Sequence, residues 1–233
     1  MNKYLPVIGA MPTQPSRQDC FSQAINSILR QVDRLYVFLD QFDQIPEYIA
    51  KIPGLHIALL PKDSKLHHAS RFLVPKIWGR ECIVMCFDDD IIYPSDYVEK
   101  MKLKLYQCDG RVILGVHGGY FLPPYTSYIK DRQMFHFSAS LEIDTQVNLI
   151  GVGTAVWLSS RLEVDLVAWK YPTKNDLSFA LTAVQQRIPM VLVARQKNWL
   201  TSIKRDVSDS LWNKVKLDDS IDTVLMRELI NNL

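Results

Sequence analysis

The sequence predicts an α/β fold in which a central, mostly parallel sheet is flanked by helices. Apolar segments of strand length occupy residues 5–10 and 34–39, and residues 18–31 between them carry apolar side chains at helical spacing. A strand, a helix and a second strand in this order open a parallel βαβ unit. At 233 residues, of which 48% are hydrophobic, the chain is long enough for one sizeable domain and short for two.

The later segments continue this alternation. The apolar run 82–87 is uninterrupted, which is typical of a strand that a sheet buries on both faces. Residues 120–132 contain two adjacent prolines and three tyrosines and predict a loop. Further strands are expected at 55–60, 111–116, 135–138, 145–150, 155–158 and 190–194, and further helices at 97–105, 177–187 and 218–233.

Three consecutive acids, Asp88, Asp89 and Asp90, follow the strand at 82–87. In an extended segment alternate side chains share a side, so Asp88 and Asp90 are expected to point one way and Asp89 the other. Open α/β sheets bind ligands at the carboxyl ends of their strands, and two carboxylates there suit a hard divalent cation. The alternative is a solvated acidic loop that ends the strand and caps a helix starting around Pro94.

The run DDDIIYPSDY, placed after a hydrophobic strand, resembles the Asp-x-Asp segment of nucleotide-sugar glycosyltransferases with the GT-A fold. The resemblance is greatest to the inverting group called family 2, many of whose members are bacterial. It implies that Asp88 and Asp90 flank a Mn²⁺ or Mg²⁺ ion carrying a nucleoside diphosphate, with Asp89 in the nucleotide-sugar site. The implied reaction moves a sugar from a donor, with UDP favoured, to a hydroxyl of a glycan or glycolipid acceptor in surface polysaccharide or glycoconjugate synthesis.

The same resemblance suggests residues that hold the nucleotide. The loop MPTQPSR after the first strand matches a proline-containing loop of the family, and Asp40 ends the second strand. By that match Pro12, Arg17 and Asp40 contact the nucleotide. A basic residue before an aromatic one then reaches the phosphates, and Arg71 fits this position better than Lys65. Arg17 could instead be a surface arginine and Asp40 a turn residue.

In the second half of the chain, the resemblance places Gly153 beneath the donor sugar and the general base at Asp176. Gly153 lacks a Cβ, so the backbone can approach a ligand there. Asp176 stands at the start of the helix expected at 177–187, where Asn and Asp are also preferred as caps. The family's more frequent Glu-Asp pair reads Asn-Asp here. A basic segment that closes over the diphosphate in relatives corresponds to Arg195, Lys197, Lys204 and Arg205. The alternative for this segment is a solvated basic face.

We expect a glycosyltransferase domain over 1–205, with a nucleotide-binding half at 1–117 and an acceptor half at 118–205, followed by a helical tail at 206–233. The tail is amphipathic and is expected to dock on its own domain, with a partner protein or a membrane surface as alternatives. The apolar face of this tail is expected to comprise Ile221, Val224, Leu225, Leu229 and Ile230.

Composition excludes several classes of protein. The net charge of +2 gives no reason to expect nucleic acid, and no apolar run reaches the roughly 20 residues of a membrane helix. The N-terminus lacks the apolar region of a signal peptide, and the four cysteines form no CxxC pair, so reduced thiols in a cytoplasmic protein are expected. His67 and His68 are expected to be solvated, and His117 at a strand end to be a packing residue.

Two other functions remain open. A non-catalytic module of this fold could bind a nucleotide or glycan within a larger complex. A sugar-phosphate nucleotidylyltransferase ranks lower, because the expected glycine-rich loop after the first strand is replaced by MPTQPSR, which contains no glycine.

Overall fold

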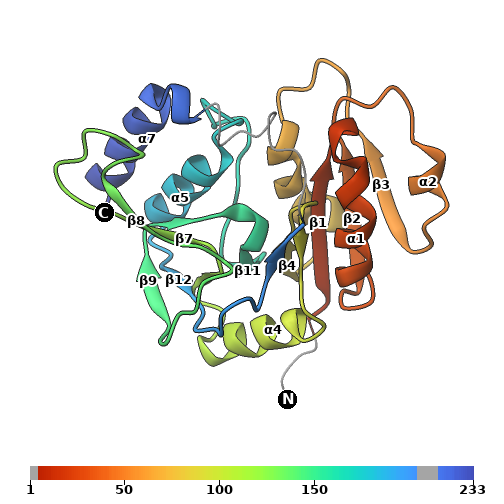
Figure 1. The fold of residues 1–233 in the computed structure, drawn as a ribbon, viewed down its shortest axis with the longest axis horizontal. Helices are drawn as coiled ribbons and strands as arrows, with labels where there is room; N and C mark the ends of the chain where they lie inside the picture. The colour runs from red at the N-terminus through yellow and green to blue at the C-terminus, as the bar shows by residue number, and fades with distance from the viewer. Residues whose placement is uncertain (1–4, 204–214) are drawn as a thin grey trace.

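The protein is an α/β domain built on an eight-stranded mixed sheet, seen here in a computed structural model that describes residues 5–203 and 215–233 (Figure 1). The α/β class with a mostly parallel sheet is therefore confirmed. The strand order is β3-β2-β1-β4-β11-β6-β12-β9. The strands span Val7–Thr13 (β1), Arg34–Leu39 (β2), Leu55–Leu59 (β3), Ile83–Cys86 (β4), Ile113–Gly115 (β6), Thr145–Val147 (β9), Val156–Leu158 (β11) and Met190–Leu192 (β12).

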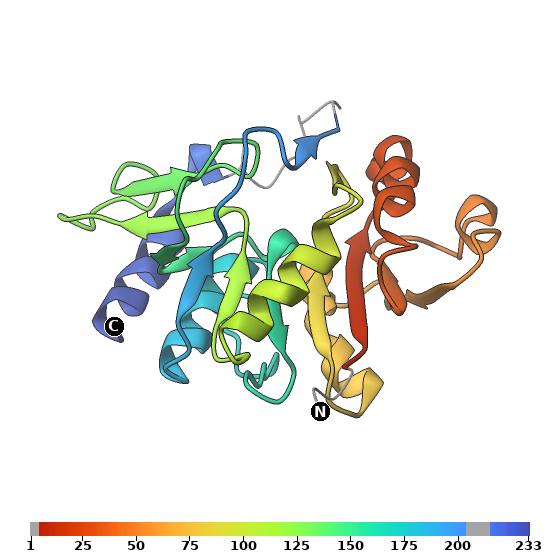
Figure 2. The ribbon, with the colours of Figure 1, turned by 90° about the horizontal axis from the view of Figure 1, so that it is seen from below.

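Helices cover both faces of the sheet and create two apolar cores (Figures 1 and 2). Side chains alternate along the strands, so Val7 and Met11 pack on one face while Ile8 and Ala10 pack on the other. This explains why β1 reads as a continuous apolar run. The first face is covered by α1 (Gln18–Ile28), α2 (Glu47–Ala50) and α4 (Tyr97–Gln107), and the second by α3 (Val74–Trp78), α5 (Asn175–Gln185) and α7 (Ser220–Asn231).

One strand runs against the others in the middle of the sheet. β11 is antiparallel to both of its neighbours, β4 and β6, whereas β1 is parallel to β2 and β4. The start of β11 therefore lies at the edge where β4 and β6 end. The residues just before β11 form a 3-10 turn, η3 (Val152–Thr154), so this turn meets the segment that follows β4.

β1 is longer than expected and runs through Pro12 to Thr13, where a loop was predicted. Proline lacks the N–H that a strand ladder uses, which is why a loop was predicted here. Pairing with β4 ends at Ala10, while pairing with β2 continues to Thr13. The ring of Pro12 thus lies beyond the last β4 residue and costs no ladder bond there.

The helix after the acidic triplet begins at Tyr97, the start of the helix predicted at 97–105, and not around Pro94. α4 starts at Tyr97 with Asp96 as its N-cap, and Pro94 belongs to a preceding turn in which the Tyr97 N–H donates to the Pro94 carbonyl at 3.0 Å. Residues 91–92 form a two-residue strand, β5 (Ile91–Ile92), paired with β13 (Thr201–Ser202). That pairing occupies the two residues that immediately follow the acidic triplet.

A hairpin replaces part of the loop expected at 120–132. β7 (Gly118–Phe121) pairs with β8 (Arg132–Phe135), and β10 (Leu149–Ile150) completes a three-stranded sheet. Gly118 and Gly119 lower the strand propensity of this segment, but the close approach of neighbouring backbone requires glycine at both positions. A Cβ on Gly118 would lie 2.2 Å from the Leu149 carbonyl oxygen, and one on Gly119 would lie 2.0 Å from that of Gln133.

The C-terminal helix α7 docks on α5, as expected, but with a different buried face. Leu225, Met226 and Leu229 are buried, whereas Ile221 and Val224 are 41% and 57% exposed. The buried face includes polar side chains that the amphipathic pattern assigned to solvent, Asp222 and Thr223. Asp222 pairs with Lys174 before α5, and Thr223 accepts a hydrogen bond from the Tyr128 N–H in the loop after β7.

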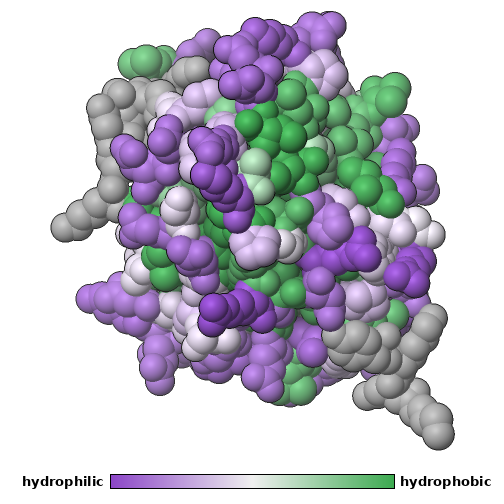
Figure 3. All heavy atoms as spheres, turned by 90° about the vertical axis from the view of Figure 1, so that its right-hand side faces the viewer, coloured by the Kyte–Doolittle hydropathy of each residue, from purple (hydrophilic) through white to green (hydrophobic). Residues whose placement is uncertain are grey.

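The opposite edge of the sheet is β3, which Figure 3 views from outside. Apolar side chains lie among polar ones on this side; Leu59 at the end of β3 is 41% exposed, and Ile45 before α2 is 42% exposed.

The four cysteines are free thiols, and three of them are buried, in agreement with the sequence. Within residues 5–203 and 215–233, no helix is both long and apolar enough to cross a membrane.

Candidate functional site

A cavity of about 290 Å³ lies where β1 and β4 end and β11 begins. We call it the aspartate cavity, because Asp88, Asp89 and Asp90 form part of its wall. Eight residues that the sequence singled out line it, although they come from five separate segments of the chain. They are Pro12, Arg17, Arg71, Asp88, Asp89, Asp90, Gly153 and Asp176.

Asp89 and Asp90 occupy a turn, and Asp88 immediately precedes it. Asp89 is buried and accepts a hydrogen bond of 2.6 Å from the Thr13 hydroxyl, which the extension of β1 brings into reach. The Asp88 and Asp90 side chains stay 38% and 30% exposed. Asp88 and Asp90 are therefore the open carboxylates, as expected, but the turn and not strand alternation separates them from Asp89.

Two buried arginines pair with the open carboxylates. Arg71 donates from Nη2 to Asp88 Oδ1 at 2.9 Å, and Arg17 donates from Nη1 to Asp90 Oδ2 at 3.1 Å. Arg71 is 2% exposed and Arg17 is 7% exposed, so neither is the surface arginine that the sequence left open. Arg71 Nη1 and Arg17 Nε are buried and have no hydrogen-bond partner among the described residues. These N–H groups are donors available to an anionic ligand.

Tyr93 and Tyr97 connect the aspartates to the turn before β11. The Tyr93 hydroxyl accepts from the Asp88 N–H at 2.8 Å and donates to the Gly153 carbonyl at 2.6 Å. The Tyr97 hydroxyl donates to the Thr154 carbonyl at 3.3 Å. Sequence reasoning used these tyrosines only as part of a motif; their bonds explain why the motif has a hydroxyl-bearing aromatic at both positions.

Gly153 leaves space for the Asp88 carboxylate. A Cβ at this position would lie 1.9 Å from Asp88 Oδ2, closer than any real contact. The absence of a side chain therefore serves the aspartate directly. The sequence had assigned this glycine to an approach of the backbone to a donor sugar.

Asp176 lies in the first turn of α5 but does not cap it. The N-cap position belongs to Lys174, and the Asp176 carboxylate accepts a 3.0 Å hydrogen bond from the Val152 N–H across the cavity wall. Burial raises the pKa of Asp176 to about 6, although the Val152 N–H lowers it. A carboxylate near its pKa at neutral pH suits proton transfer.

Burial also raises the pKa of two of the clustered aspartates. The pKa of Asp89 rises to about 7, although the Thr13 hydroxyl opposes the shift. The pKa of Asp90 rises to about 6 through burial and then through the charge of Asp88. Like charges held this close disfavour joint ionisation, and a bound cation would relieve that repulsion.

Asp40 and both neighbouring histidines differ from expectation. Asp40 is buried and pairs with His67 Nδ1 at 3.0 Å; it is not among the residues that line the aspartate cavity. His68 was expected to be solvated but lines the cavity, where burial lowers its pKa to about 4. Adjacent histidines in a polar loop carry no signal that would reveal this.

The described residues of the basic segment after β12, Arg195 and Lys197, do not line the aspartate cavity. Arg195 is buried and donates to the backbone carbonyls of Val193 and His136 at 3.1 and 2.9 Å, so it serves the chain rather than a phosphate. Lys197 is exposed. Lys204 and Arg205 lie outside the described residues.

Comparison of the sequence with models of protein families found no matching family, and comparison with curated proteins found no match. The aspartate cavity itself combines two open carboxylates, two buried guanidinium groups and, in Asp176, a further carboxyl group whose pKa is raised by burial.

Proposed function

We propose that the protein is a glycosyltransferase of the GT-A type, which moves a sugar from a nucleoside diphosphate, UDP being favoured, to a hydroxyl acceptor with inversion. One observation carries the proposal: a single cavity joins Asp88 and Asp90, two buried arginines, and Asp176. Groups for binding a diphosphate and a group for accepting a proton thus face the same space. Sugar transfer from a nucleoside diphosphate needs both.

The charge of the cavity favours a divalent cation that accompanies the donor. Its lining includes four carboxylates and only two guanidinium groups, and burial keeps His68 neutral near pH 7. A diphosphate alone would meet an excess of negative charge. The described residues hold no group of three or more His, Cys, Asp or Glu side chains around one point, so the ion would take further ligands from phosphate and water, as Mg²⁺ commonly does.

The residues present therefore fit a Mn²⁺ or Mg²⁺ ion held by Asp88 and Asp90. When bound, such an ion supplies positive charge to the departing diphosphate. Arg71 Nη1 and Arg17 Nε would donate to phosphate oxygens, which gives these buried N–H groups the partners they lack. Asp89, fixed by Thr13, would hold the turn in place rather than contact the ion.

Asp176 is the proposed general base. The proton of the acceptor hydroxyl passes to its carboxylate while the hydroxyl oxygen bonds to the anomeric carbon. The bond from that carbon to the diphosphate oxygen breaks, and its electron pair leaves with the diphosphate. A base on the side opposite the leaving group gives inversion.

A donor-hydrolysis screen tests the proposal, using a panel of nucleotide sugars with and without Mn²⁺. We expect the release of nucleoside diphosphate to require Mn²⁺ and to be lost in Asp90→Ala. The control variant Asp63→Ala, which removes an exposed carboxylate, should keep it. Mn²⁺-dependent UDP binding without any turnover would instead favour a non-catalytic binding module. Unchanged turnover in Asp90→Ala would exclude the metal role.

A further inference from the structure

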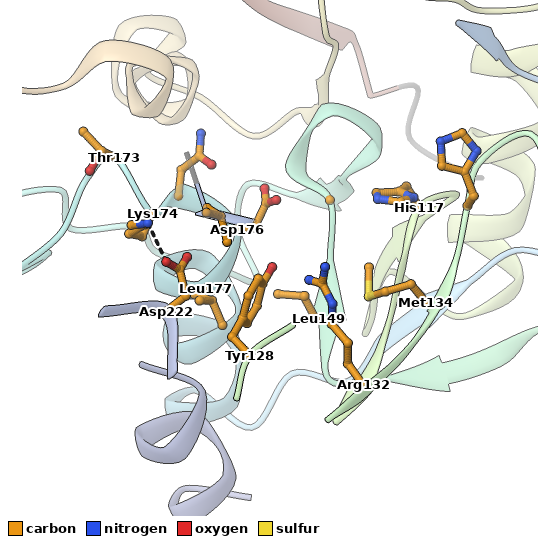
Figure 4. Close-up of a pocket in the computed structure, with 14 residues that line it drawn as sticks. His117, Tyr128, Arg132, Met134, Leu149, Thr173, Lys174, Asp176, Leu177 and Asp222 are labelled. Carbon is orange, nitrogen blue, oxygen red and sulfur yellow. Dashed lines mark hydrogen bonds and ion pairs between the residues drawn. The ribbon is translucent and has the colours of Figure 1, made fainter. Parts of the chain in front are cut away.

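A second cavity of about 470 Å³ adjoins the aspartate cavity. Both are lined by His117, Gly151, Asn175 and Asp176, so Asp176 faces both spaces. The second cavity lies between the β7–β8 hairpin, α5 and α7 (Figure 4). Its volume is within the range of pockets that bind small molecules.

Apolar groups line part of the second cavity. Met134 on β8, Leu149 on β10 and Leu177 on α5 contribute aliphatic surface, and Tyr128 rises between them with its hydroxyl towards Asp176 (Figure 4). A sugar ring has apolar C–H faces and a rim of hydroxyl groups. Aliphatic and aromatic surface beside a hydrogen-bonding carboxylate matches both parts of such a ring.

The charges in this wall are neutralised or committed within the protein. Lys174 pairs with Asp222 of α7 at 2.5 Å, and the Asp222 side chain is only 5% exposed. Arg132 places its guanidinium over the Tyr128 ring, 4.3 Å from the ring centre. Burial lowers the pKa of His117 to about 4 and also lowers the pKa of His136, so both rings are neutral near pH 7.

We propose that the second cavity receives the acceptor, and that the acceptor presents an uncharged sugar ring there with one hydroxyl towards Asp176. This inference rests on the proposed transferase function and adds the chemical class of the second substrate. It assigns α7 a part in the site, because Asp222 holds Lys174 two residues from the base. Among the described residues of this wall, the cations Lys174 and Arg132 are matched in number by the carboxylates of Asp176 and Asp222, so a ring bearing a carboxylate or phosphate would meet no excess of positive charge.

Saturation-transfer NMR tests the acceptor class, with UDP and Mg²⁺ present. The probes are the methyl glycosides of glucose, galactose and N-acetylglucosamine, compared with glucuronic acid and glucose 6-phosphate. We expect a saturation-transfer signal, which reports binding, for at least one neutral glycoside. The larger side chain of Met134→Trp fills the second cavity and should weaken glycoside binding about tenfold or more. Leu103→Trp, on the 57% exposed position of α4, is the matched control and should bind as the parent does.

Calorimetric titration with UDP and Mg²⁺ separates this inference from the proposed function. Met134→Trp that binds UDP as the parent does is folded, so its loss of glycoside binding supports the second cavity as the acceptor site. Tyr128→Phe provides a second, milder variant that should weaken the same signal. Preference for the acidic sugars, no glycoside binding, or binding indifferent to both variants would overturn the inference. Failure of the parent to bind UDP would instead count against the proposed function.

Discussion

At the scale of single residues, the position of Asp88 depends on three contacts. Arg71 binds one carboxylate oxygen, the Tyr93 hydroxyl accepts from the Asp88 N–H, and Gly153 leaves room for the other oxygen. These contacts come from different parts of the chain and act on one side chain. The rotamer of a proposed metal ligand is thus set by its neighbours, as a precise binding site requires.

Substitution Gly153→Ala tests this arrangement. The added methyl would overlap Asp88 Oδ2, so the carboxylate must turn away. We expect UDP–Mn²⁺ binding to weaken by roughly tenfold or more, at a cost of about 1–3 kcal/mol in stability from overpacking. Isothermal titration calorimetry and urea denaturation measure the two effects separately.

Gly54→Ala is the control for that substitution. No atom lies within 4 Å of its added Cβ, and its φ of +84° means that alanine costs stability without touching the cavity. A loss of stability with normal nucleotide binding is expected. If Gly153→Ala also kept normal binding, the proposed constraint on Asp88 would be wrong.

The raised pKa of Asp176 gives a pH prediction. A base must be ionised to accept a proton, and burial raises the pKa of this carboxyl to about 6. The transfer rate should therefore be highest above pH 7 and fall as the pH drops through about 6. Asp176→Asn should lower the rate by ~10²–10⁴-fold and remove this acid limb. A pH profile of single-turnover rates at saturating donor provides the measurement; an acid limb that persists in Asp176→Asn would exclude Asp176 as its source.

At the scale of elements, α7 holds the loop 122–131 against the body of the domain. Asp219 accepts from the Ser127 hydroxyl at 2.6 Å and from the Ile129 N–H at 3.1 Å, and Thr223 accepts from the Tyr128 N–H at 2.9 Å. These bonds position Tyr128 in the second cavity. α7 is therefore a structural part of the domain and not an accessory tail.

Thr223→Val should measure one of these bonds. The replacement keeps the shape of the side chain but leaves the Tyr128 N–H without its acceptor in a buried position. A loss of about 1–3 kcal/mol in the free energy of unfolding is expected. Val224→Thr, the reverse change at a 57% exposed position of the same helix, should stay within about 0.5 kcal/mol. Equal stability of the two variants in urea denaturation would contradict the role of this bond.

Elements with a strong apolar period were predictable, and those defined by pairing were not. β2 was predicted at its observed bounds, because its apolar run is isolated by polar residues. β7 and β8 were missed because glycines and polar residues have low strand propensity, and only the backbone partners found in the fold justify them. The exposure of Ile221 and Val224 could not be predicted from the sequence either. The buried face of α7 is set by hydrogen bonds of Asp219 and Thr223 to the loop 122–131.

At the scale of the whole molecule, ligand binding should stabilise the fold only when both components are present. UDP with Mn²⁺ at 100 times its dissociation constant adds about 2.7 kcal/mol, which raises Tm by roughly 5–10 °C in a domain of this size. UDP alone should give little shift, because the aspartate cavity has an excess of carboxylates. Differential scanning fluorimetry with UDP, Mn²⁺ and both distinguishes these cases, and a full shift from UDP alone would refute the need for a cation.

Much of the site was predictable, and the rest depended on contacts distant in sequence. Asp88 and Asp90 follow a strand, and Arg17 precedes a helix at the same sheet edge. Arg71 lies within a 3-10 segment, η2 (His67–Leu73), and was assigned only through the family resemblance. The pairing of Lys174 with Asp222 joins residues 48 positions apart and leaves no local pattern. Asp40 shows what sequence order leaves out. Its position at the end of a strand was predicted correctly, but its hydrogen-bond partner, His67, was not.

A strand that runs against its neighbours begins where they stop. The turn that precedes β11 therefore holds two carboxylates of one cavity: Gly153 leaves room for Asp88, and the Val152 N–H donates to Asp176. The spacing between these two carboxylates is then fixed by a few peptide units rather than by the closing of two lobes. Lengthening that turn by one residue would displace both carboxylates together.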